Sequence, residues 1–318
     1  MDSKKGLEQV KVFAPASVAN VSCGFDVLGF ALQSPGDEII ARRVESSSKL
    51  EIVTVTGANG MLPTSVEKNT AGVAAQMLLD YLECEFGIEL EIHKKMPLGS
   101  GLGSSAASSV GAVVAVNRLL GSPLEDKELL QFAAEGERVA CGTAHLDNVA
   151  PSLLGGVVFI RDQESADVFA LECPKPLFAT VVHPQIEIKT EDTRKILRRD
   201  IPLKKAVTQW GNVGGLVAGL LKGDYGLISR SLHDEIIEPV RSVLIPGFDK
   251  VKEAAINADV LGSGISGSGP SVFALSSTRG TAVRAGKRMQ GAFDKIGLEN
   301  ECYISKVNEQ GPQILEEK

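Results

Sequence analysis

The sequence predicts an α+β protein built from two domains. Segments with the two-residue alternation of strands and segments with helical spacing follow one another without the regular strand–helix order of a doubly wound sheet. The 318 residues, 43% hydrophobic and 23% charged, are enough for two domains with apolar cores. Charged residues and prolines gather over residues 161–176, so we expect one domain over residues 1–168 and a second over 169–318.

In the first half, β-rich runs between turn residues predict strands, and apolar residues at helical spacing predict helices. The expected strands are residues 10–15, 37–44, 49–57 and 89–96. The expected helices are residues 70–84 and 104–120, and Gly121 ends the second of them. Residues 122–125 (SPLE) match a capping box with proline at the first helical position, so a further helix is predicted from Pro123 to about Cys141.

From residue 155 onward, the sequence predicts strands on either side of a long helical region. The expected strands are residues 155–160, 167–172, 178–183 and 271–276. A charged stretch over residues 187–200 opens a mostly helical region that reaches Ala258, and a last helix begins at about Thr281. Residues 308–318 are acidic, and we expect them to form a frayed tail.

Composition narrows the classes of function. The net charge of −7, from 33 basic and 40 acidic residues, disfavours nucleic acid as a partner, because such affinity comes mainly from neutralised phosphates. Apolar stretches stop short of the roughly 18 residues that a membrane span needs. The first nine residues have no apolar segment behind them, so we expect no secretory signal. Five scattered cysteines without a C-x-x-C pair indicate reduced thiols in a cytoplasmic protein and no zinc site.

A glycine-serine loop, residues 97–108 (PLGSGLGSSAAS), lies between a predicted strand and a predicted helix. Its alternating glycines allow a tight turn that exposes successive N–H groups, and the helix start adds donors and a positive dipole end. Such a site suits a phosphate, although a tight turn with close packing would use the same glycines. The loop lacks the Gly-Lys-Ser/Thr ending of a P-loop and the spacing of a dinucleotide fingerprint.

Four segments together resemble the GHMP kinases, in the form found in homoserine kinases. Residues 97–108 resemble the second motif of that family, and residues 262–270 (GSGISGSGP) resemble the third. Residues 14–20 (APASVAN) with 24–29 (GFDVLG) look like the first motif, and residues 142–151 (GTAHLDNVAP) look like a string typical of homoserine kinases. The matches reach from residue 12 to residue 275, so the resemblance covers nearly the whole chain.

The resemblance implies a fold and a reaction. The N-terminal domain would be ribosomal-protein-S5-like and the C-terminal domain a ferredoxin-like α/β plait. The reaction would be ATP-dependent phosphorylation of the side-chain hydroxyl of L-homoserine to O-phospho-L-homoserine, in threonine biosynthesis. We expect ATP and L-homoserine as substrates, Mg²⁺ as metal, a homodimer, and no nucleic acid or membrane partner.

On the nucleotide side, the resemblance assigns one contiguous loop and a few residues outside it. Ser105 and Glu137 are implied to hold Mg²⁺, a sparse oxygen-only ligand set that suits this ion. Without the family, Glu137 would be interpreted as a surface carboxylate and Asn69 as a helix N-cap. The residues implied to bind ATP are Asn69, Pro97, Leu98, Gly99, Ser100, Gly101, Leu102, Gly103, Ser104, Ser105, Ala106, Ala107 and Gly267.

On the acceptor side, the resemblance implies a pocket for an amino acid. Arg194 and Arg241 would bind its carboxylate and Asp26 its ammonium, although a single arginine in a charged run is often only solvated. The remaining residues implied to line the pocket are Asn20, His145, Asp147 and Asn148, and Thr190 would face the transferred phosphate. The residues expected to contribute to catalysis are Asn20, Glu137, Asn148 and Thr190.

The sequence offers no evident general base, since Asn148 is uncharged and Asp147 is a poor substitute. We therefore expect catalysis by alignment and charge stabilisation, with the proton leaving late. Two alternatives remain open. A kinase for another small alcohol, such as mevalonate, is disfavoured because mevalonate has no ammonium for Asp26. A catalytically silent ligand sensor is disfavoured because Ser105 and Glu137 are present.

Overall fold

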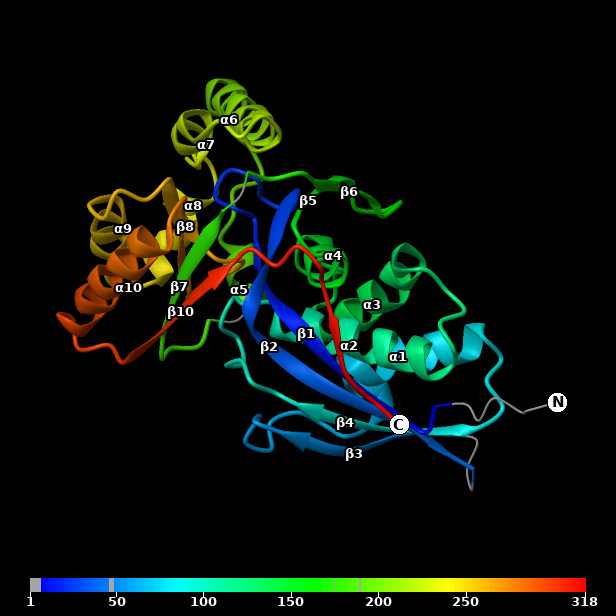
Figure 1. Cartoon of the computed structure of the whole chain (residues 1–318). Coiled ribbons are helices and arrows are strands. Elements are labelled where there is room, and N and C mark those ends of the chain that lie inside the picture. The colour runs from blue at the N-terminus through cyan, green and yellow to red at the C-terminus, as the bar shows by residue number, and fades with distance from the viewer. Residues whose placement is uncertain (1–6, 46–48, 175, 189) are drawn as a thin grey trace.

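Two β-sheets, one in each half of the molecule, organise the chain in the computed structural model, which describes residues 7–45, 49–174, 176–188 and 190–318 (Figure 1). The larger sheet has the order β11-β1-β2-β4-β3, and β5 and β6 extend it from β2. Its strands β3 and β4 are parallel, and the other neighbours are antiparallel. The strands of this sheet are β1 (Gln9–Ala19), β2 (Leu28–Val44), β3 (Leu50–Thr56), β4 (Gly87–His93), β5 (Val157–Asp162), β6 (Asp167–Leu171) and β11 (Gln313–Glu317).

Strand β2 is much longer than the sequence indicates, since it begins at Leu28 and not at residue 37. Its first five residues, 28–32, are all buried, so they lack the alternation of polar and apolar residues by which a half-exposed strand is recognised. The extra length lets β2 pair with β5 at its start and with β4 further on. Strand β2 therefore connects the part of the sheet that contains β5 with the part that contains β4.

Four helices cover one face of this sheet: α1 (Thr70–Tyr81), α2 (Ser104–Leu119), α3 (Asp126–Cys141) and α4 (Leu146–Leu154). Helix α2 lies at the centre and is buried along nearly its whole length. Its small residues permit this, because at Gly111 a side chain would collide with Ile39 of β2 and crowd Ala14 of β1. The predicted helices over residues 70–84 and 104–120 are confirmed, with slightly earlier ends.

Helix α3 begins three residues later than predicted. The N-cap is Glu125, whose side chain accepts from the backbone of Glu128, while the Glu128 carboxylate accepts from the Glu125 N–H at 2.8 Å. The capping box is thus Glu125–Glu128 and not residues 122–125. Ser122 has a φ of 59°, not the extended backbone typical of a serine N-cap, so the prediction placed the motif one turn too early.

The smaller sheet has the order β10-β7-β9-β8, with every pair antiparallel. Its strands are β7 (Phe178–Pro184), β8 (Gly262–Ile265), β9 (Val272–Ser276) and β10 (Asn300–Lys306). Helices α9 (Phe248–Ile256) and α10 (Arg279–Asp294) pack on it. In the glycine-serine segment over residues 262–270, the first four residues form β8 and the others form the loop that leads to β9.

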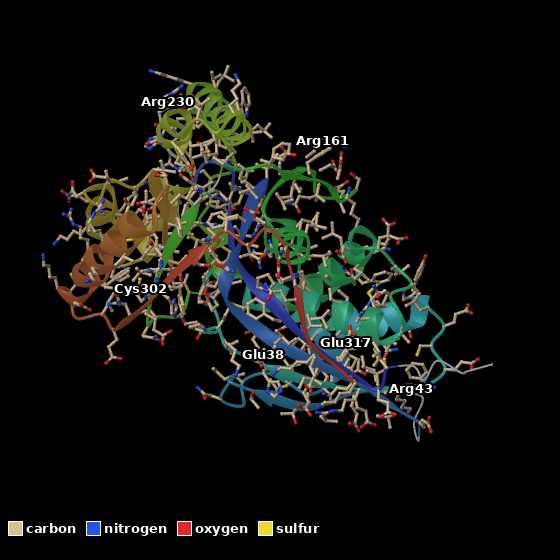
Figure 2. All side chains as sticks on the ribbon, viewed as in Figure 1. Glu38, Arg43, Arg161, Arg230, Cys302 and Glu317 are labelled. Carbon is tan, nitrogen blue, oxygen red and sulfur yellow. The ribbon has the colours of Figure 1, made fainter. Side chains whose placement is uncertain are left out.

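Helices α6 (Leu203–Lys222) and α7 (Tyr225–Ser231) form a hairpin that projects from the top of the molecule in Figure 1. Arg230 of α7 is labelled in that hairpin in Figure 2. Short elements lie between the hairpin and the cleft, namely α5 (Thr190–Lys195), α8 (Glu238–Arg241) and the 3₁₀ turn η2 (Ser242–Leu244); a second such turn, η1 (Val66–Lys68), precedes α1.

The last residues are not a frayed tail. Strand β11 pairs with β1, and Glu317, labelled in Figure 2, forms an ion pair with Arg118 of α2 at 2.5 Å. The C-terminal segment thus belongs to the N-terminal sheet, while the division expected at residue 168 falls inside β6. Helices and strands occur as the α+β prediction requires. Among the described residues, no helix has the length and apolarity to cross a membrane.

Candidate active site

A cleft of about 740 Å³ separates the two sheets. From the N-terminal half it is lined by residues 97–101, the start of α2, the loop over residues 57–63 and Glu137 of α3. The start of α4 adds His145, Asp147 and Asn148. From the C-terminal half it receives the end of β7, Arg194, Arg241 and the loop at Gly267. All four segments that carry the family resemblance therefore meet at one place.

The phosphate loop, residues 97–103, is shaped by glycine at two close approaches. Gly101 has a φ of 78°, and a side chain there would collide with the carbonyl of Ser266. Gly103 has a φ of 66°, and a side chain there would collide with the hydroxyl of Ser17 and press on Asn148. No other residue fits both the backbone and the space, so the glycines serve the turn and the packing together.

The loop at residues 262–270 is fastened to the phosphate loop. Ser266 Oγ donates to the Gly101 carbonyl at 2.7 Å, and Ser271 Oγ donates to the Ser100 carbonyl at 2.5 Å. Asn20 Nδ2 donates to the Gly267 carbonyl at 2.8 Å. These bonds use carbonyl groups, so they leave the N–H groups of the phosphate loop available to an anion.

A buried ion pair lies under the first turn of α2, and sequence reasoning missed it. The Lys94 ammonium contacts the Asp37 carboxylate and donates to the Ser104 carbonyl and the Ser108 hydroxyl, each at 2.7 Å. Asp37 also accepts from the Lys95 N–H at 2.8 Å and from the Ser104 hydroxyl at 3.2 Å. All three ammonium protons are used. The pair therefore fixes the turn from which Ser105 projects.

Several side-chain oxygens of residues that line the cleft are buried without a hydrogen-bond partner in the part of the chain that the structure describes. Two of them are Ser105 Oγ and Glu137 Oε1. Glu137 is 3% exposed, so it is not the surface carboxylate that its place on a helix would indicate. Burial raises its pKa, while the Ser105 hydroxyl and the Lys94 charge act in the opposite direction. Orphaned oxygen donors of this kind fit a small, hard divalent cation.

Opposite these atoms lies a charged cluster. Arg194 donates both Nη atoms to the Asp26 carboxylate, at 2.8 and 3.2 Å, and Nη2 also lies 3.2 Å from His145 Nδ1. Arg241 is 3% exposed and donates to the Gly267 carbonyl at 3.2 Å. Both guanidinium groups lie over the Phe25 ring, at 5.5 and 5.0 Å from its centre. Burial and the neighbouring Arg194 lower the pKa of Arg241 to about 10.

The charge states of two further residues follow from burial. Burial, together with the Arg194 charge, lowers the pKa of His145 to about 4, so the imidazole is neutral. Burial and the Asp26 charge raise the pKa of Asp147 to about 7. Asp26, His145 and Asp147 lie close enough to share a metal ion, but Arg194 already occupies Asp26 and His145. Two arginines beside the group further disfavour a cation there.

The loop that carries Asp26 has an unusual backbone. Asn20, Val21, Ser22 and Asp26 all have φ between 42° and 70°, a region that side chains other than glycine's rarely adopt. Asn20 Oδ1 accepts from the Asp26 N–H at 3.0 Å and closes the loop. Such a conformation persists only where the surroundings hold it in place, and it is common at ligand sites.

Most of the predicted site residues meet in the cleft. On the acceptor side these are Asn20, Asp26, His145, Asp147, Asn148, Arg194 and Arg241. On the nucleotide side they are Asn69, Pro97, Leu98, Gly99, Ser100, Gly101, Gly103, Ser104, Ser105, Glu137 and Gly267.

Three residues expected at the nucleotide, Leu102, Ala106 and Ala107, instead pack in the core behind the loop. Asn69 is the N-cap of α1, as its sequence position indicates, because its side chain accepts from the Ala71 N–H at 3.0 Å. The side chain of Thr190 lies outside the described part of the chain. His183 and Lys94 also line the cleft, and no motif in the sequence marks either one.

Comparison with known proteins agrees with the family resemblance of the sequence motifs. Residues 69–156 match the N-terminal domain of the GHMP kinases, and residues 216–295 match their C-terminal domain. A homoserine kinase of Chlorobium phaeobacteroides is 48% identical, over 97% of this chain and the whole of its own length. A homoserine kinase of Xanthomonas campestris is 40% identical, over 98% and 95% of the two chains.

The chain belongs to the homoserine kinase branch of the GHMP kinase family. A solved homoserine kinase from Cytophaga hutchinsonii is 54% identical and superimposes with a TM-score of 0.95 over 99% of both chains. A mevalonate kinase from L. major, at 17% identity and a TM-score of 0.70 over 93% of this chain and 96% of its own, shares the fold. The predicted α+β fold of a GHMP kinase is therefore confirmed.

Proposed function

We propose that this protein transfers the γ-phosphoryl group of ATP to the side-chain hydroxyl of L-homoserine. One observation carries the proposal: a phosphate loop with available N–H groups and a cluster suited to a zwitterion face each other across one cleft. The curated relatives named homoserine kinase support the same activity. The product, O-phospho-L-homoserine, would serve threonine biosynthesis in the cytoplasm.

ATP would lie along residues 97–105 with its adenine toward Asn69, because this side of the cleft offers backbone donors and the N-terminal end of α2. Mg²⁺ fits Ser105 and Glu137, two residues with orphaned oxygens, which would hold it beside the phosphates. When bound, the ion would neutralise charge on the transferred group. The Lys94–Asp37 pair binds the neighbouring Ser104 and so fixes the turn that carries Ser105.

Homoserine would bind in the charged cluster, where each of its ionic groups finds an opposite charge. Arg241 and Arg194 suit the carboxylate, since a guanidinium binds it through two parallel hydrogen bonds. Asp26 suits the ammonium. In the structure, Arg194 and Asp26 form an ion pair with each other. The substrate would replace this ion pair with two others, one between its carboxylate and the arginines and one between its ammonium and Asp26.

For the transfer itself, the residues act by position. Ser17 Oγ donates to Asn148 Oδ1 at 2.9 Å, which leaves Asn148 Nδ2 to donate to a substrate oxygen. Asn20 and His145 complete the wall around the acceptor, and Thr190 would face the transferred phosphate. No residue is assigned as general base, and the hydroxyl proton would leave late, to a phosphate oxygen or to water.

The activity is tested by measuring ADP release with homoserine, mevalonate and galactose as acceptors in parallel. We expect turnover only where the acceptor carries both a free carboxylate and a free amine, because the cluster provides for both. Homoserine with its carboxylate amidated is the matched control and should react poorly. Comparable rates with mevalonate would refute the assignment.

We propose that the chain also pairs with a second copy of itself through α6. Leu203, Val207 and Trp210 lie on its solvent-facing side at the four- and three-residue spacing of a helix–helix seam, and Trp210 is 64% exposed. The exposed Leu221 follows Trp210 after 11 residues, about three turns, and so lies on the same side. Sedimentation should give a dimer for the native chain and a monomer for Trp210→Glu. A monomeric native chain would refute this pairing.

A further inference from the structure

Gln209, on the inner side of α6, is buried although its side chain is polar. Its Nε2 donates to the Cys23 carbonyl at 2.8 Å and to Asp234 Oδ1 at 3.0 Å, and its Oε1 accepts from the Glu235 N–H at 2.9 Å. The two donors thus face acceptors and the acceptor faces a donor, which fixes the orientation of the amide. A fully used buried amide of this kind holds its partners in a defined geometry.

The first partner segment is the loop that carries Asp26. Cys23 lies between Ser22 and Asp26, two of the residues with left-handed backbone, and Phe25 in the same loop contacts both arginines. Because this conformation is unfavourable for the loop alone, it needs outside contacts to persist. Gln209 supplies one of them from the opposite half of the molecule.

The second partner segment is the start of α8, which carries Arg241. Asp234 accepts from the N–H groups of Ile236, Ile237 and Glu238 at 2.8 to 3.0 Å and so binds the beginning of this helix. Gln209 joins the same carboxylate and also binds the backbone of Glu235. Arg241 ends the four-residue helix, so its position depends on how α8 is anchored.

We infer that Gln209 is a positioning residue that sets the distance between Asp26 and Arg241, and thereby the fit of the cleft to the ammonium and carboxylate of an α-amino acid. The inference rests on the proposed assignment of these two residues to the acceptor. Asp26 and Arg241 come from different halves of the chain, and Gln209 connects their segments through one side chain. Within the described part of the chain, the hydrogen-bond partners of Gln209 are Cys23, Asp234 and Glu235, none of which is assigned to the nucleotide, so we expect the effect to fall on the acceptor alone.

Helix α6 offers a matched control. Asn212, one turn further along, donates Nδ2 to the His233 carbonyl at 2.8 Å. It binds the same α7–α8 connection as Gln209 but is not bonded to the loop at Cys23. A loss of helix docking alone would therefore affect the Asn212→Leu and Gln209→Leu variants alike, whereas the proposed role affects only the latter.

The test compares Gln209→Leu, Gln209→Asn and Asn212→Leu by steady-state kinetics and by calorimetric titration of homoserine without nucleotide. We expect Gln209→Leu to raise the KM and the Kd for homoserine about ten-fold and to leave the KM for ATP within about two-fold. Gln209→Asn keeps an amide but is too short to reach both partners, so it should raise the KM and the Kd for homoserine by an intermediate amount. This variant replaces Gln209→Leu in the test if the leucine variant does not fold. Asn212→Leu should leave both KM values near those of the native enzyme.

Three outcomes would overturn the inference: an unchanged homoserine Kd in both Gln209 variants, an equal rise in the KM for ATP, or the same homoserine shift in Asn212→Leu. Arg241→Lys is measured alongside. If it leaves the homoserine KM unchanged, the acceptor assignment itself has failed. If it raises that KM while the Gln209 variants do not, only the role of Gln209 has failed.

Discussion

The two sides of the cleft differ in how they prepare for a charged ligand. The proposed nucleotide side offers backbone N–H groups, and the charges beneath it, Lys94 and Asp37, satisfy each other in the core. The proposed acceptor side presents side-chain charges directly to the cleft, where Arg194 pairs with Asp26 and also contacts His145. A phosphate chain can be bound by backbone geometry, whereas a small zwitterion needs two opposite charges at a set distance.

This comparison also explains where polar atoms are left unpartnered. On the proposed nucleotide side the unpartnered atoms are oxygens, namely Ser100 Oγ, Ser105 Oγ and Glu137 Oε1, and the last two suit a cation. On the acceptor side they include His145 Nε2 and Asp147 Oδ1, which suit the polar groups of an amino acid. Each side therefore lacks the partner that its own ligand would bring.

The largest effect is expected at the metal position. Glu137→Gln removes the buried carboxylate, so turnover should fall roughly a thousand-fold and the Mg²⁺ requirement should rise. Nucleotide binding followed by fluorescence titration with Mn²⁺ should weaken in parallel. The fold should remain, because a buried charge is replaced by a neutral group of equal size. Normal activity and metal dependence would mean that Glu137 plays no part at the nucleotide.

The next effect tests whether the nucleotide side depends on its buried ion pair. Lys94→Met leaves Asp37 buried and unpaired and should lower the free energy of unfolding by about 3–5 kcal/mol. Adding Asp37→Leu should restore most of that stability, since it removes the orphaned charge. The KM for ATP should stay raised in the double variant, because Ser104 and Ser108 still lack their anchor. If the double variant has the native KM for ATP, the Lys94–Asp37 ion pair does not contribute to nucleotide binding.

A smaller effect is expected on the acceptor side. Arg241→Lys keeps the charge but loses the planar fork, so the homoserine KM should rise about ten- to a hundred-fold. The KM for ATP should hardly change, because the proposed nucleotide site is formed by residues 97–105. Steady-state kinetics with each substrate varied in turn separates the two. An equal shift in both would place Arg241 at the phosphates.

The smallest effect concerns pH. Because burial raises the pKa of Asp147 to about 7, the folded state binds more protons than the unfolded state between pH 4 and pH 7, and stability decreases as pH rises through that window. Asp147→Asn should remove this loss, so its stability gain over the native chain should be larger at pH 8 than at pH 5, by roughly 2–3 kcal/mol. Denaturant unfolding at the two pH values measures the difference. Equal gains at both would mean that Asp147 is ionised throughout.

Local patterns in the sequence predicted the loops of the site but not what supports them. The glycine-serine runs at residues 97–103 and 262–270 can be recognised from their composition. The contact between them through Ser266 could not be predicted, because it forms only in the folded chain. Lys94 and Gln209 lie far along the chain from their partners Asp37 and Cys23, and no spacing rule joins them. Helix α4 was not predicted, since residues 146–154 contain Pro151 and were interpreted as a polar motif.

The strands that were missed share a physical cause. The start of β2 is buried throughout, β10 is mostly half-buried, and β11 is short and largely exposed, so none shows a clear alternation. Their pairing energy comes from neighbours distant in sequence. The Glu137 carboxylate is a similar case, because its burial depends on α2 and not on its own helix.

The place of β11 in the N-terminal sheet also bears on how the molecule forms. On the ribosome β1 is made first and β11 last, so one edge of β1 has no permanent partner until residues 313–317 have been synthesised. An unpaired edge of this kind can join other chains or recruit a chaperone. The sheet of the N-terminal half is therefore completed only after the C-terminal half has been synthesised.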